Sequence, residues 1–401
     1  MPHNSRHALS VQHSMHVIPP TLFIGLMSGT SLDGVDGVLC RIGDDGQPAV
    51  VAYAHEPFSA AVRAVALQLN TPGHNELQLS AHVGIALAHY SAQVCATLLH
   101  RSGLNAGQVR AVASHGQTVR HAPQATTTLD NAPSVGYSVQ VNNPALLAEL
   151  TGIDVVADFR SRDIAAGGQG APLVPAFHRH VFGSTDPETS VAVLNVGGMA
   201  NVSLCSNLTV AGCDTGPGNV LLDSWAQRHI GRDFDQDGAW GATGTVNLAL
   251  LASLLRAPFF NTNQATAPTS TGRDLFNASW LKLALVGFEQ LAPEDVQATL
   301  AALTARSAAH QLSHLTVNSA WPDTVLVCGG GAYNRHLMAQ LQSTMPQSTV
   351  RRTDDAGMPA MQVEACAFAW LAWCFVHRRT ANVVAATGAR GPRVLGALYP
   401  H

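Results

Sequence analysis

The chain has 401 residues, of which 46% are hydrophobic and 12% are charged. This composition supports a large buried core, excludes disorder over most of the length, and fits two or three domains or one large α/β unit. The formal net charge of −4 excludes non-specific nucleic-acid binding, which needs a basic face. Lys282 is the only lysine, so a GxxxxGK[ST] phosphate loop is excluded, and Schiff-base chemistry would have to use Lys282.

The cysteines indicate a reducing compartment. There are seven, scattered and never spaced as CxxC, so neither a disulfide framework nor a zinc cluster is predicted. The apolar runs are too short to span a membrane. Residues 1–20 are rich in His, Ser and Pro without the apolar core of a signal peptide, so we expect a loose extension there. Together these features predict a cytoplasmic protein.

The first part of the chain predicts a hairpin followed by strand–helix alternation. Two apolar runs, Thr21–Met27 and Val35–Ile42, flank an Asp-Gly turn, which is typical of a β-hairpin. Ala49–Tyr53 predicts a third strand. Helical spacing over Asn75–Gly103 predicts a long helix that stops at a glycine, and Val109–Ser114 predicts a buried strand.

The later part repeats this order. Strands are predicted at Asp154–Asp158, Ser190–Asn195, Asn201–Leu204, Leu208–Ala211 and Thr324–Cys328, and helices at Val220–His229, Pro293–Leu315, Ala332–Met345 and Met361–Val376. In both parts a hairpin with a glycine turn precedes strand–helix alternation. This pattern predicts two similar α/β halves around a cleft.

Four glycine-rich loops follow predicted strands: Gly29–Asp36, Asn195–Gly198, Asp214–Asn219 and Gly329–Gly331. Glycine lets backbone N–H groups approach a phosphate without a Cβ in the way. Four such loops favour a nucleotide cleft, with ordinary turns as the alternative.

The first loop carries polar groups suited to phosphate. Thr30 and Ser31 offer hydroxyl donors, and Asp33 offers a carboxylate for Mg²⁺ or its water shell. The alternative is that Asp33 and Gly34 only form the hairpin turn.

Asp214 is a candidate general base, because a carboxylate at the floor of a cleft can accept a proton from water or a hydroxyl. The alternative is that Asp214 caps the following helix. Asp158, Asp163 and Asp237 are rival carboxylates, and their spacing does not decide between them.

Histidine and arginine supply further candidates. A lone histidine such as His115 is more often structural than catalytic. Arg160 and Arg162 could clamp a carboxylate, or form a surface pair. No HExxH-like spacing occurs, so we assign no protein-bound metal.

Several longer motifs run in one order from Thr21 to the C-terminus. The most specific are FIGLMSGTSLDGVD at 23–36 and AGGQGAPL at 166–173. The others are SHGQT at 114–118, VADFR at 156–160, LNVGG at 194–198, DTGPGN at 214–219, FDQDG at 234–238, VCGGGAYN at 327–334 and LGA at 395–397. On these motifs the chain resembles the anhydro-N-acetylmuramic acid kinase family.

The resemblance implies an α/β, two-domain actin-like ATPase fold of the ribonuclease H-like type with a hinged interdomain cleft. We expect an N-terminal domain at 21–160 and 380–401, with the phosphate-binding hairpin. A C-terminal domain at 161–379 would carry the catalytic Asp and the glycine loop near the adenosine.

The resemblance also implies the reaction. A kinase using ATP and Mg²⁺ would open 1,6-anhydro-N-acetylmuramic acid with water and phosphorylate O6, giving N-acetylmuramic acid 6-phosphate in cell-wall recycling. By its place in the DTGPGN motif, Asp214 would activate the water. A homodimer is implied as well.

Residue roles follow from these motifs. The expected nucleotide-binding residues are Gly29, Thr30, Ser31, Leu32, Asp33, Gly34, Val35, Asp36, Asn195, Gly197, Gly198, Gly329, Gly330 and Gly331. The expected substrate-binding residues are His115, Gln117, Thr118, Arg160 and Glu364. Arg160 is the candidate for the lactyl carboxylate, and Glu364 either faces the sugar or is buried with a structural partner.

Two other functions stay open. One is a kinase of the same architecture that acts on an ordinary sugar hydroxyl. The other is an ATP-binding scaffold of the actin or Hsp70 type, although the long insertions or peptide-binding domain expected of it are not seen in the sequence. Asn142, where the family pattern has Gly, and a long insert at 126–137 depart from the family on the substrate side of the cleft.

Overall fold

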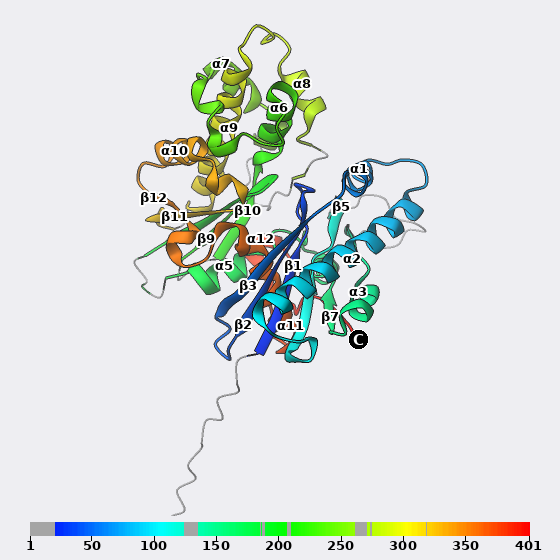
Figure 1. Ribbon diagram of the computed structural model, residues 1–401. Coiled ribbons are helices and arrows are strands. Elements are labelled where there is room, and N and C mark those ends of the chain that lie inside the picture. The colour runs from blue at the N-terminus through cyan, green and yellow to red at the C-terminus, as the bar shows by residue number, and fades with distance from the viewer. Residues whose placement is uncertain are drawn as a thin grey trace, which may run out of the picture.

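The computed structural model describes residues 21–123, 135–184, 186, 189–206, 210–260, 271–272, 275–317 and 319–401. The extension at 1–20, most of the insert at 126–137 and Leu208 of the predicted hairpin lie outside the described residues. The described residues form two mixed β-sheets, each with its own helices (Figure 1).

The first sheet has the strand order β13-β7-β4-β1-β2-β3. Its strands are β1 (Thr21–Met27), β2 (Gly34–Ile42), β3 (Pro48–Pro57), β4 (Val109–Ser114), β7 (Val155–Ala157) and β13 (Ala397–Tyr399). The first three strands are antiparallel neighbours, whereas β4 runs parallel to β1 and β7 runs parallel to β4. The predicted hairpin is therefore confirmed.

The second sheet repeats this arrangement, with the order β10-β9-β8-β11-β12. Its strands are β8 (Val191–Val196), β9 (Met199–Cys205), β10 (Val210–Pro217), β11 (Thr324–Cys328) and β12 (Thr349–Arg352). Again the first three strands are antiparallel and the last two are parallel to the first. Two copies of one five-strand order confirm the predicted two-domain actin-like ATPase fold.

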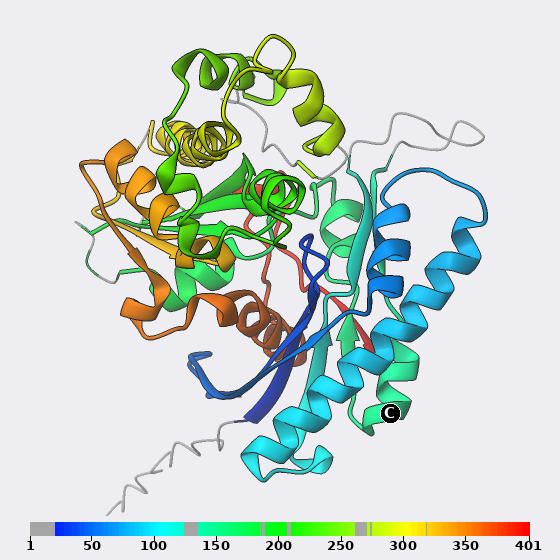
Figure 2. The same ribbon diagram turned by 45° about the horizontal axis from the view of Figure 1, so that its top comes forward.

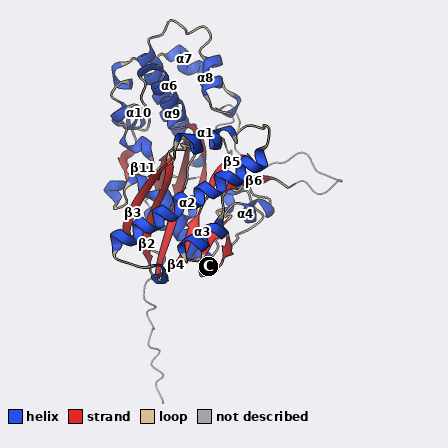
Figure 3. Cartoon of the chain, turned by 45° about the vertical axis from the view of Figure 1, so that its right-hand side comes forward, coloured by secondary structure: helices blue, strands red, loops and turns tan. Residues whose placement is uncertain are grey.

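Helices cover both faces of the first sheet. On one face lie α2 (Glu76–Ser102) and α3 (Pro144–Thr151), as Figure 3 shows, and on the other lies α11 (Val363–Val376). Successive residues of β1 point to opposite faces, so Ile24 packs in the core with α2 while Phe23 packs in the larger core with α11. A Cβ on Gly25 would lie against the carbonyl of Ala365, which is why this strand residue is a glycine.

In the second half, α9 (Pro293–Leu315) packs on β9 and β10. The helices α6 (Asn219–Ile230), α7 (Leu248–Leu254) and α8 (Ala278–Ala284) gather with α9 at the top of Figure 1. The other helices are α1 (Ala60–Gln68), α4 (Ser161–Ala165), α5 (Pro175–Phe182), α10 (Arg335–Thr344) and α12 (Val384–Thr387), and a two-stranded sheet is formed by β5 (Gln117–Ala122) and β6 (Tyr137–Val141).

Three details differ from the sequence predictions. The helix predicted over Ala332–Met345 is a 3₁₀ turn followed by α10, because Asn334 breaks the run and caps α10 through its side chain. The Asp214–Asn219 loop is in fact the last part of β10 and the first residues of α6. The β5–β6 hairpin was not predicted.

No helix in the described part of the chain is long and apolar enough to cross a membrane.

Candidate active site

The loop between β1 and β2 enters the space between the two halves (Figure 2). The side chain of Gln117 stabilises the conformation of this loop. It accepts a hydrogen bond from Ser28 Oγ at 2.5 Å and donates one from Nε2 to the carbonyl of Gly29 at 3.1 Å. Leu32, not Gly34, takes the left-handed conformation, with φ 59°. Gly34 is instead required by space, because a Cβ there would meet the carbonyl of Glu56.

A loop from the second half lies directly against this hairpin. A Cβ on Gly198 would lie 2.7 Å from Thr30 Oγ1, so the two loops approach as closely as a glycine permits. The backbone N–H of Asn219 donates to the carbonyl of Gly197 at 2.8 Å, which ties the second loop to the start of α6. The predicted glycine loops of the two halves are therefore brought together.

Two cavities open on either side of this contact. Cavity I, of about 260 Å³, lies between the β5 segment and the second half. Its polar lining residues are Ser28, Thr30, Ser31, Asn70, His115, Thr118, Arg120, His121, Arg160, Asn195, Asn201, Asp214, Thr271 and Glu364.

Cavity II, of about 420 Å³, is lined by glycines and carboxylates. The acidic lining residues are Asp33, Asp36, Asp223, Asp235, Asp237 and Glu364. Neither lysine nor arginine is among the described residues that line it. An anionic ligand in this cavity would therefore meet no positively charged side chain among the described lining residues.

The two cavities share a border. Both are lined by Met27, Gly29, Ser31, Gly197, Gly198 and Glu364. A group transferred from a ligand in cavity II to one in cavity I would pass at this border, between the hairpin loop and the Gly197–Gly198 loop.

Asp214 lies on the cavity I side and is 9% exposed. It occupies a break in the β9–β10 register, and Oδ2 accepts a hydrogen bond from the backbone N–H of Thr271 at 2.8 Å. It does not cap α6, whose N-cap is Gly218.

The three rival carboxylates, Asp158, Asp163 and Asp237, do not line cavity I. Asp163 is fully buried and accepts hydrogen bonds from Gly170, Asn382 and Thr387, so it fixes the glycine-rich loop to the C-terminal segment. Asp158 is exposed, outside both cavities. Asp237 lines cavity II and pairs with Arg335.

Partly buried Arg160 and buried His115 form a pair in cavity I. Nη1 of Arg160 donates to the carbonyl of Gly170 at 2.6 Å, and Nη2 lies 3.0 Å from Nε2 of His115. Burial lowers the pKa of Arg160 to about 10, while Asp214 and Glu364 oppose that shift, so the guanidinium stays charged at neutral pH.

Glu364 stands in the first turn of α11, where both cavities meet. Desolvation raises its pKa to about 7, and the negative charges of Asp36 and Asp33 act in the same direction. A hydrogen bond from the side chain of Asn195 and the charge of Arg160 oppose the shift. Glu364 therefore changes charge near neutral pH.

The family model of anhydro-N-acetylmuramic acid kinase matches residues 21–401. The chain belongs to this family. It is 52% identical over 385 residues to the anhydro-N-acetylmuramic acid kinase of Variovorax paradoxus, which covers 94% of this chain and 99% of the relative. It is 51% identical over 387 residues to that of Bordetella pertussis, covering 96% of this chain and 97% of the relative.

Solved structures show a more distant similarity. The activator of the 2-hydroxyisocaproyl-CoA dehydratase from Clostridium difficile with bound ADPNP is 14% identical, with a TM-score of 0.45 and coverage of 89% of this chain and 96% of that chain. A ROK family glucokinase from Streptomyces griseus in complex with glucose and AMPPNP is 12% identical, with a TM-score of 0.38 and coverage of 87% and 98%.

The lining of cavity II suits a nucleotide that is bound together with a divalent cation. Asp33 and Asp36 offer hard oxygen ligands beside the hairpin loop, and Mg²⁺ is usually held by one or two carboxylates together with phosphate oxygens and waters. Within the described ranges, no group of three or more His, Cys, Asp or Glu forms a protein-only metal cage. A Cβ on Gly330 would meet nothing nearer than Asn219 Nδ2 at 3.5 Å, so the backbone there is open to a ligand.

Most of the predicted site residues line a cavity, but some do not. Leu32, Gly34, Val35, Gly331 and Gln117 line neither one. Gln117 is 1% exposed and is used to hold the hairpin loop, so the structure does not place it in contact with a ligand.

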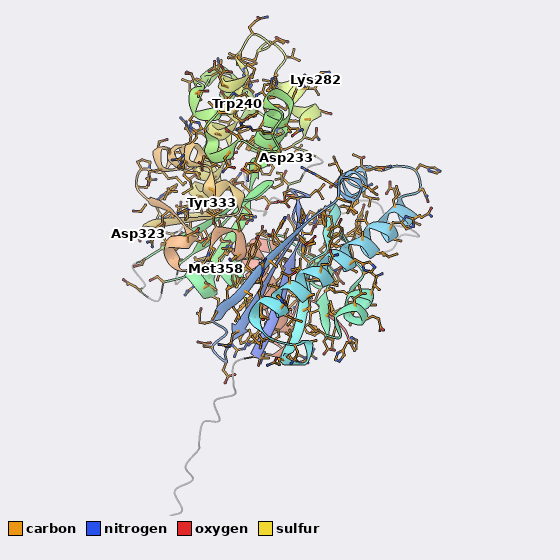
Figure 4. The ribbon with its side chains drawn as sticks, viewed as in Figure 1. Asp233, Trp240, Lys282, Asp323, Tyr333 and Met358 are labelled. Atoms are coloured by element: carbon orange, nitrogen blue, oxygen red, sulfur yellow. The ribbon has the colours of Figure 1, made fainter. Side chains whose placement is uncertain are left out.

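Arg162 is exposed on α4, outside both cavities, and Lys282 lies on α8 at the far end of the helical region in Figure 4.

Sequence reasoning missed several lining residues. Tyr333 lines cavity II from the segment that was expected to be helical, and Figure 4 shows it in the second half of the molecule. Arg120 and His121 line cavity I from the β5 strand. The available signal was their position directly after the SHGQT motif.

Proposed function

We propose that this protein transfers the γ-phosphoryl group of ATP to O6 of 1,6-anhydro-N-acetylmuramic acid while water adds to C1. The products are N-acetylmuramic acid 6-phosphate and ADP, and the reaction belongs to cell-wall recycling. The observation that carries the proposal is the shared border of the two cavities, with Asp214 on one side and the hairpin loop with Asp33 and Asp36 on the other. Membership of the family supports the choice of sugar.

Asp214 supplies the base in this scheme. The 1,6-anhydro bridge leaves O6 without a hydroxyl proton, so a water must add to C1 as the C1–O6 bond breaks. The carboxylate accepts the proton of that water, and O6 forms its new bond to the γ-phosphorus. The Thr271 N–H holds one carboxylate oxygen, Oδ2, and so fixes the orientation of the carboxylate at cavity I.

The hairpin residues bind the phosphates. The backbone N–H groups of the Gly29–Ser31 segment are the donors at the border of the cavities, with the Thr30 hydroxyl on the cavity I side, while Ser31 Oγ donates to Asp33 Oδ1 at 2.7 Å. Asp33 and Asp36 would hold Mg²⁺, which when bound offsets negative charge on the phosphates. Because cavity II offers no arginine or lysine among its described residues, we propose that nucleotide binding depends on the divalent cation.

We propose that Glu364 and Arg160 determine the net charge of the side chains beside the cavity border. Arg160 lies close enough to Asp214 and Glu364 to interact with both charges, and we propose that it balances them while the phosphates enter. With its raised pKa, Glu364 can be protonated at neutral pH, which lowers repulsion toward the phosphoryl group. We propose that it contacts the sugar at the cavity border.

Further features of the proposal follow from the resemblance. We propose a cytoplasmic homodimer, with domains at 21–160 plus 380–401 and at 161–379 that close around the ligands. The seven cysteines are all buried free thiols, which supports a reducing compartment. Closure would exclude water that could otherwise hydrolyse ATP.

Product analysis tests the function. The protein is incubated with ATP, Mg²⁺ and either 1,6-anhydro-N-acetylmuramic acid or free N-acetylmuramic acid, and the products are identified by mass spectrometry. We expect N-acetylmuramic acid 6-phosphate from the anhydro sugar and little from the free sugar. Phosphorylation of the free sugar alone would assign the protein to the kinases of ordinary hydroxyls.

A further inference from the structure

Cavity I contains a second arginine, Arg120, whose position suits an anionic group of the substrate. Arg120 lies on β5, and its side chain is 21% exposed. Nη2 is 3.1 Å from Oε2 of Glu76, in the first turn of α2, and Nη1 donates to its own neighbour, the carbonyl of Val119, at 3.1 Å. These bonds to described residues use two of the five N–H groups of a guanidinium.

Arg160 is less suited than Arg120 to bind an anionic group of the substrate. Like Arg120, Arg160 bonds through both terminal nitrogens, here to the carbonyl of Gly170 and to His115, so the difference between the two arginines lies in the charges around them. The charge of Arg160 is compensated within the site by Asp214, Glu364 and Asp163. A carboxylate bound to Arg160 would therefore compete with bonds that hold the glycine-rich loop and would face two other carboxylates.

The chemistry of the sugar separates the reacting edge from the anionic substituent. In a 1,6-anhydro-pyranose the bridge joins C1 and C6 on one side of the ring, and C3, which bears the lactyl ether, lies across the ring from it. The reacting edge belongs at the shared border, where Gly29 and Glu364 line both cavities. The C3 substituent then points away from the border, and Arg120 lines cavity I only.

The charges of the lining residues favour the same orientation of the sugar, with its C3 substituent directed away from the border. Cavity II and the border carry carboxylates, which repel an anionic substituent. The β5 wall of cavity I offers Thr118, Arg120 and His121, and burial lowers the pKa of His121 to about 4, so that ring is neutral at pH 7. Arg120 thus provides the positive charge on this wall.

We infer that Arg120 binds the lactyl carboxylate of the substrate, and that Glu76 holds the guanidinium in place before the sugar binds. This inference rests on the proposed function and moves the carboxylate contact expected at Arg160 to Arg120. Arg120 is then a specificity residue: it selects an anhydro sugar with an acidic C3 substituent over its neutral counterpart. A guanidinium–carboxylate pair gives both charge and directional hydrogen bonds for that selection.

The test compares two sugars that differ only in the lactyl group, 1,6-anhydro-N-acetylmuramic acid and 1,6-anhydro-N-acetylglucosamine. The quantity measured is the ratio of the two kcat/KM values. A loss of activity that affects both sugars equally leaves this ratio unchanged. In Arg120→Gln we expect the charged-to-neutral ratio to fall about 10- to 100-fold, as the loss of a charge-assisted pair predicts. In Glu76→Gln we expect the ratio to fall by a smaller factor than in Arg120→Gln, because Arg120 keeps its charge but loses the ion pair that holds its guanidinium in place.

Arg110→Gln is the matched control. Arg110 also forms an ion pair in the first half, with Asp154 at 2.8 Å, but it lines neither cavity, so its ratio should equal that of the wild type. If the Arg120–Glu76 pair only supports the β5 strand, both variants lose activity toward the two sugars by the same factor, and the inference is wrong. Wild-type protein that phosphorylates neither sugar would contradict the proposed function itself, and the inference with it.

Discussion

Nη2 of Arg160 lies 3.0 Å from Nε2 of His115, where the partly buried guanidinium meets the buried imidazole beside cavity I. Arginine can only donate, so Nε2 of His115 accepts, and the ring is neutral with its proton on Nδ1. Nδ1 in turn faces the carbonyl of Ser28, 3.4 Å away, in the hairpin loop. His115 therefore connects the guanidinium to the hairpin loop between β1 and β2 and does not act as an acid at neutral pH.

Neutral buried histidines should make the protein sensitive to acid. Burial lowers the pKa of His115 to about 3 and that of His178 to about 3. Because the unfolded state of each binds a proton near pH 6.5, stability is complete above that pH and falls as the pH drops toward 3. The loss per histidine is at most about 1.4 kcal/mol for each pH unit.

Chemical unfolding between pH 4 and 7 checks this prediction. His178→Gln should lower the slope of unfolding free energy against pH relative to the wild type, whereas the same change at exposed His82 should not. Equal slopes in all three proteins would show that His178 is not held neutral.

Glu364 should have the opposite effect on stability. Its folded pKa of about 7 lies above the ordinary value of 4.5, so the folded state holds the proton more strongly, and stability falls as the pH rises from about 4.5 to 7. The effect is at most about 3 kcal/mol, and less where solvent reaches the carboxylate. Glu364→Gln should therefore be more stabilising at pH 8 than at pH 4.5, as measured by the difference in unfolding free energy from the wild type. A difference independent of pH would contradict the raised pKa.

Alanine substitutions at the adjacent glycines Gly329 and Gly330 should have different effects, one on stability and the other on ATP binding. Gly329 has φ 77°, and a Cβ there would lie 2.6 Å from Asn195 Oδ1, so Gly329→Ala should lower the melting temperature by several degrees. Gly330 has open space and lines cavity II, so Gly330→Ala should fold normally but bind ATP more weakly. Differential scanning fluorimetry and calorimetric titration with ATP and Mg²⁺ measure both effects. Equal ATP affinity in Gly330→Ala and the wild type would place the nucleotide elsewhere.

Asp214→Asn should separate chemistry from binding. The amide oxygen can still accept from the Thr271 N–H, which preserves the local structure, but the amide cannot take the proton of the water. We expect turnover to fall by several orders of magnitude with nearly unchanged ATP affinity. A variant that turns over at close to the wild-type rate would assign the base to another group, with Glu364 next in line.

The elements that sequence patterns predicted well are those that are buried on both sides or bounded by special residues. Thr21–Met27 and Pro293–Leu315 were predicted with their observed bounds, because an apolar run and an acidic first turn mark them. Asn75–Gly103 was extended by one residue at each end. The Gly29–Asp36 and Gly329–Gly331 loops were found because each follows an apolar strand, where a change in composition is easy to see.

The elements that were missed depend on contacts across the chain. β5 contains Gln, Thr, Arg and His, and nothing local shows that Gln117 is buried to hold Ser28 and Gly29. Asp214 was expected in a loop because glycines and a proline follow it, yet pairing with β9 makes the segment a strand. Glu364 stands on a helix whose other side chains are almost all apolar, so no polar face predicted which way it points.

Isotope labelling tests the central claim most directly, namely that water opens the bridge as O6 takes the phosphate. The protein is incubated with ATP, Mg²⁺ and 1,6-anhydro-N-acetylmuramic acid in ¹⁸O-water, and the product is trapped by rapid reduction of C1 before mass analysis. We predict one heavy oxygen at C1 and none in the phosphoryl group. A phosphorylated sugar that still has its anhydro bridge, or a heavy oxygen in the phosphate, would contradict the account.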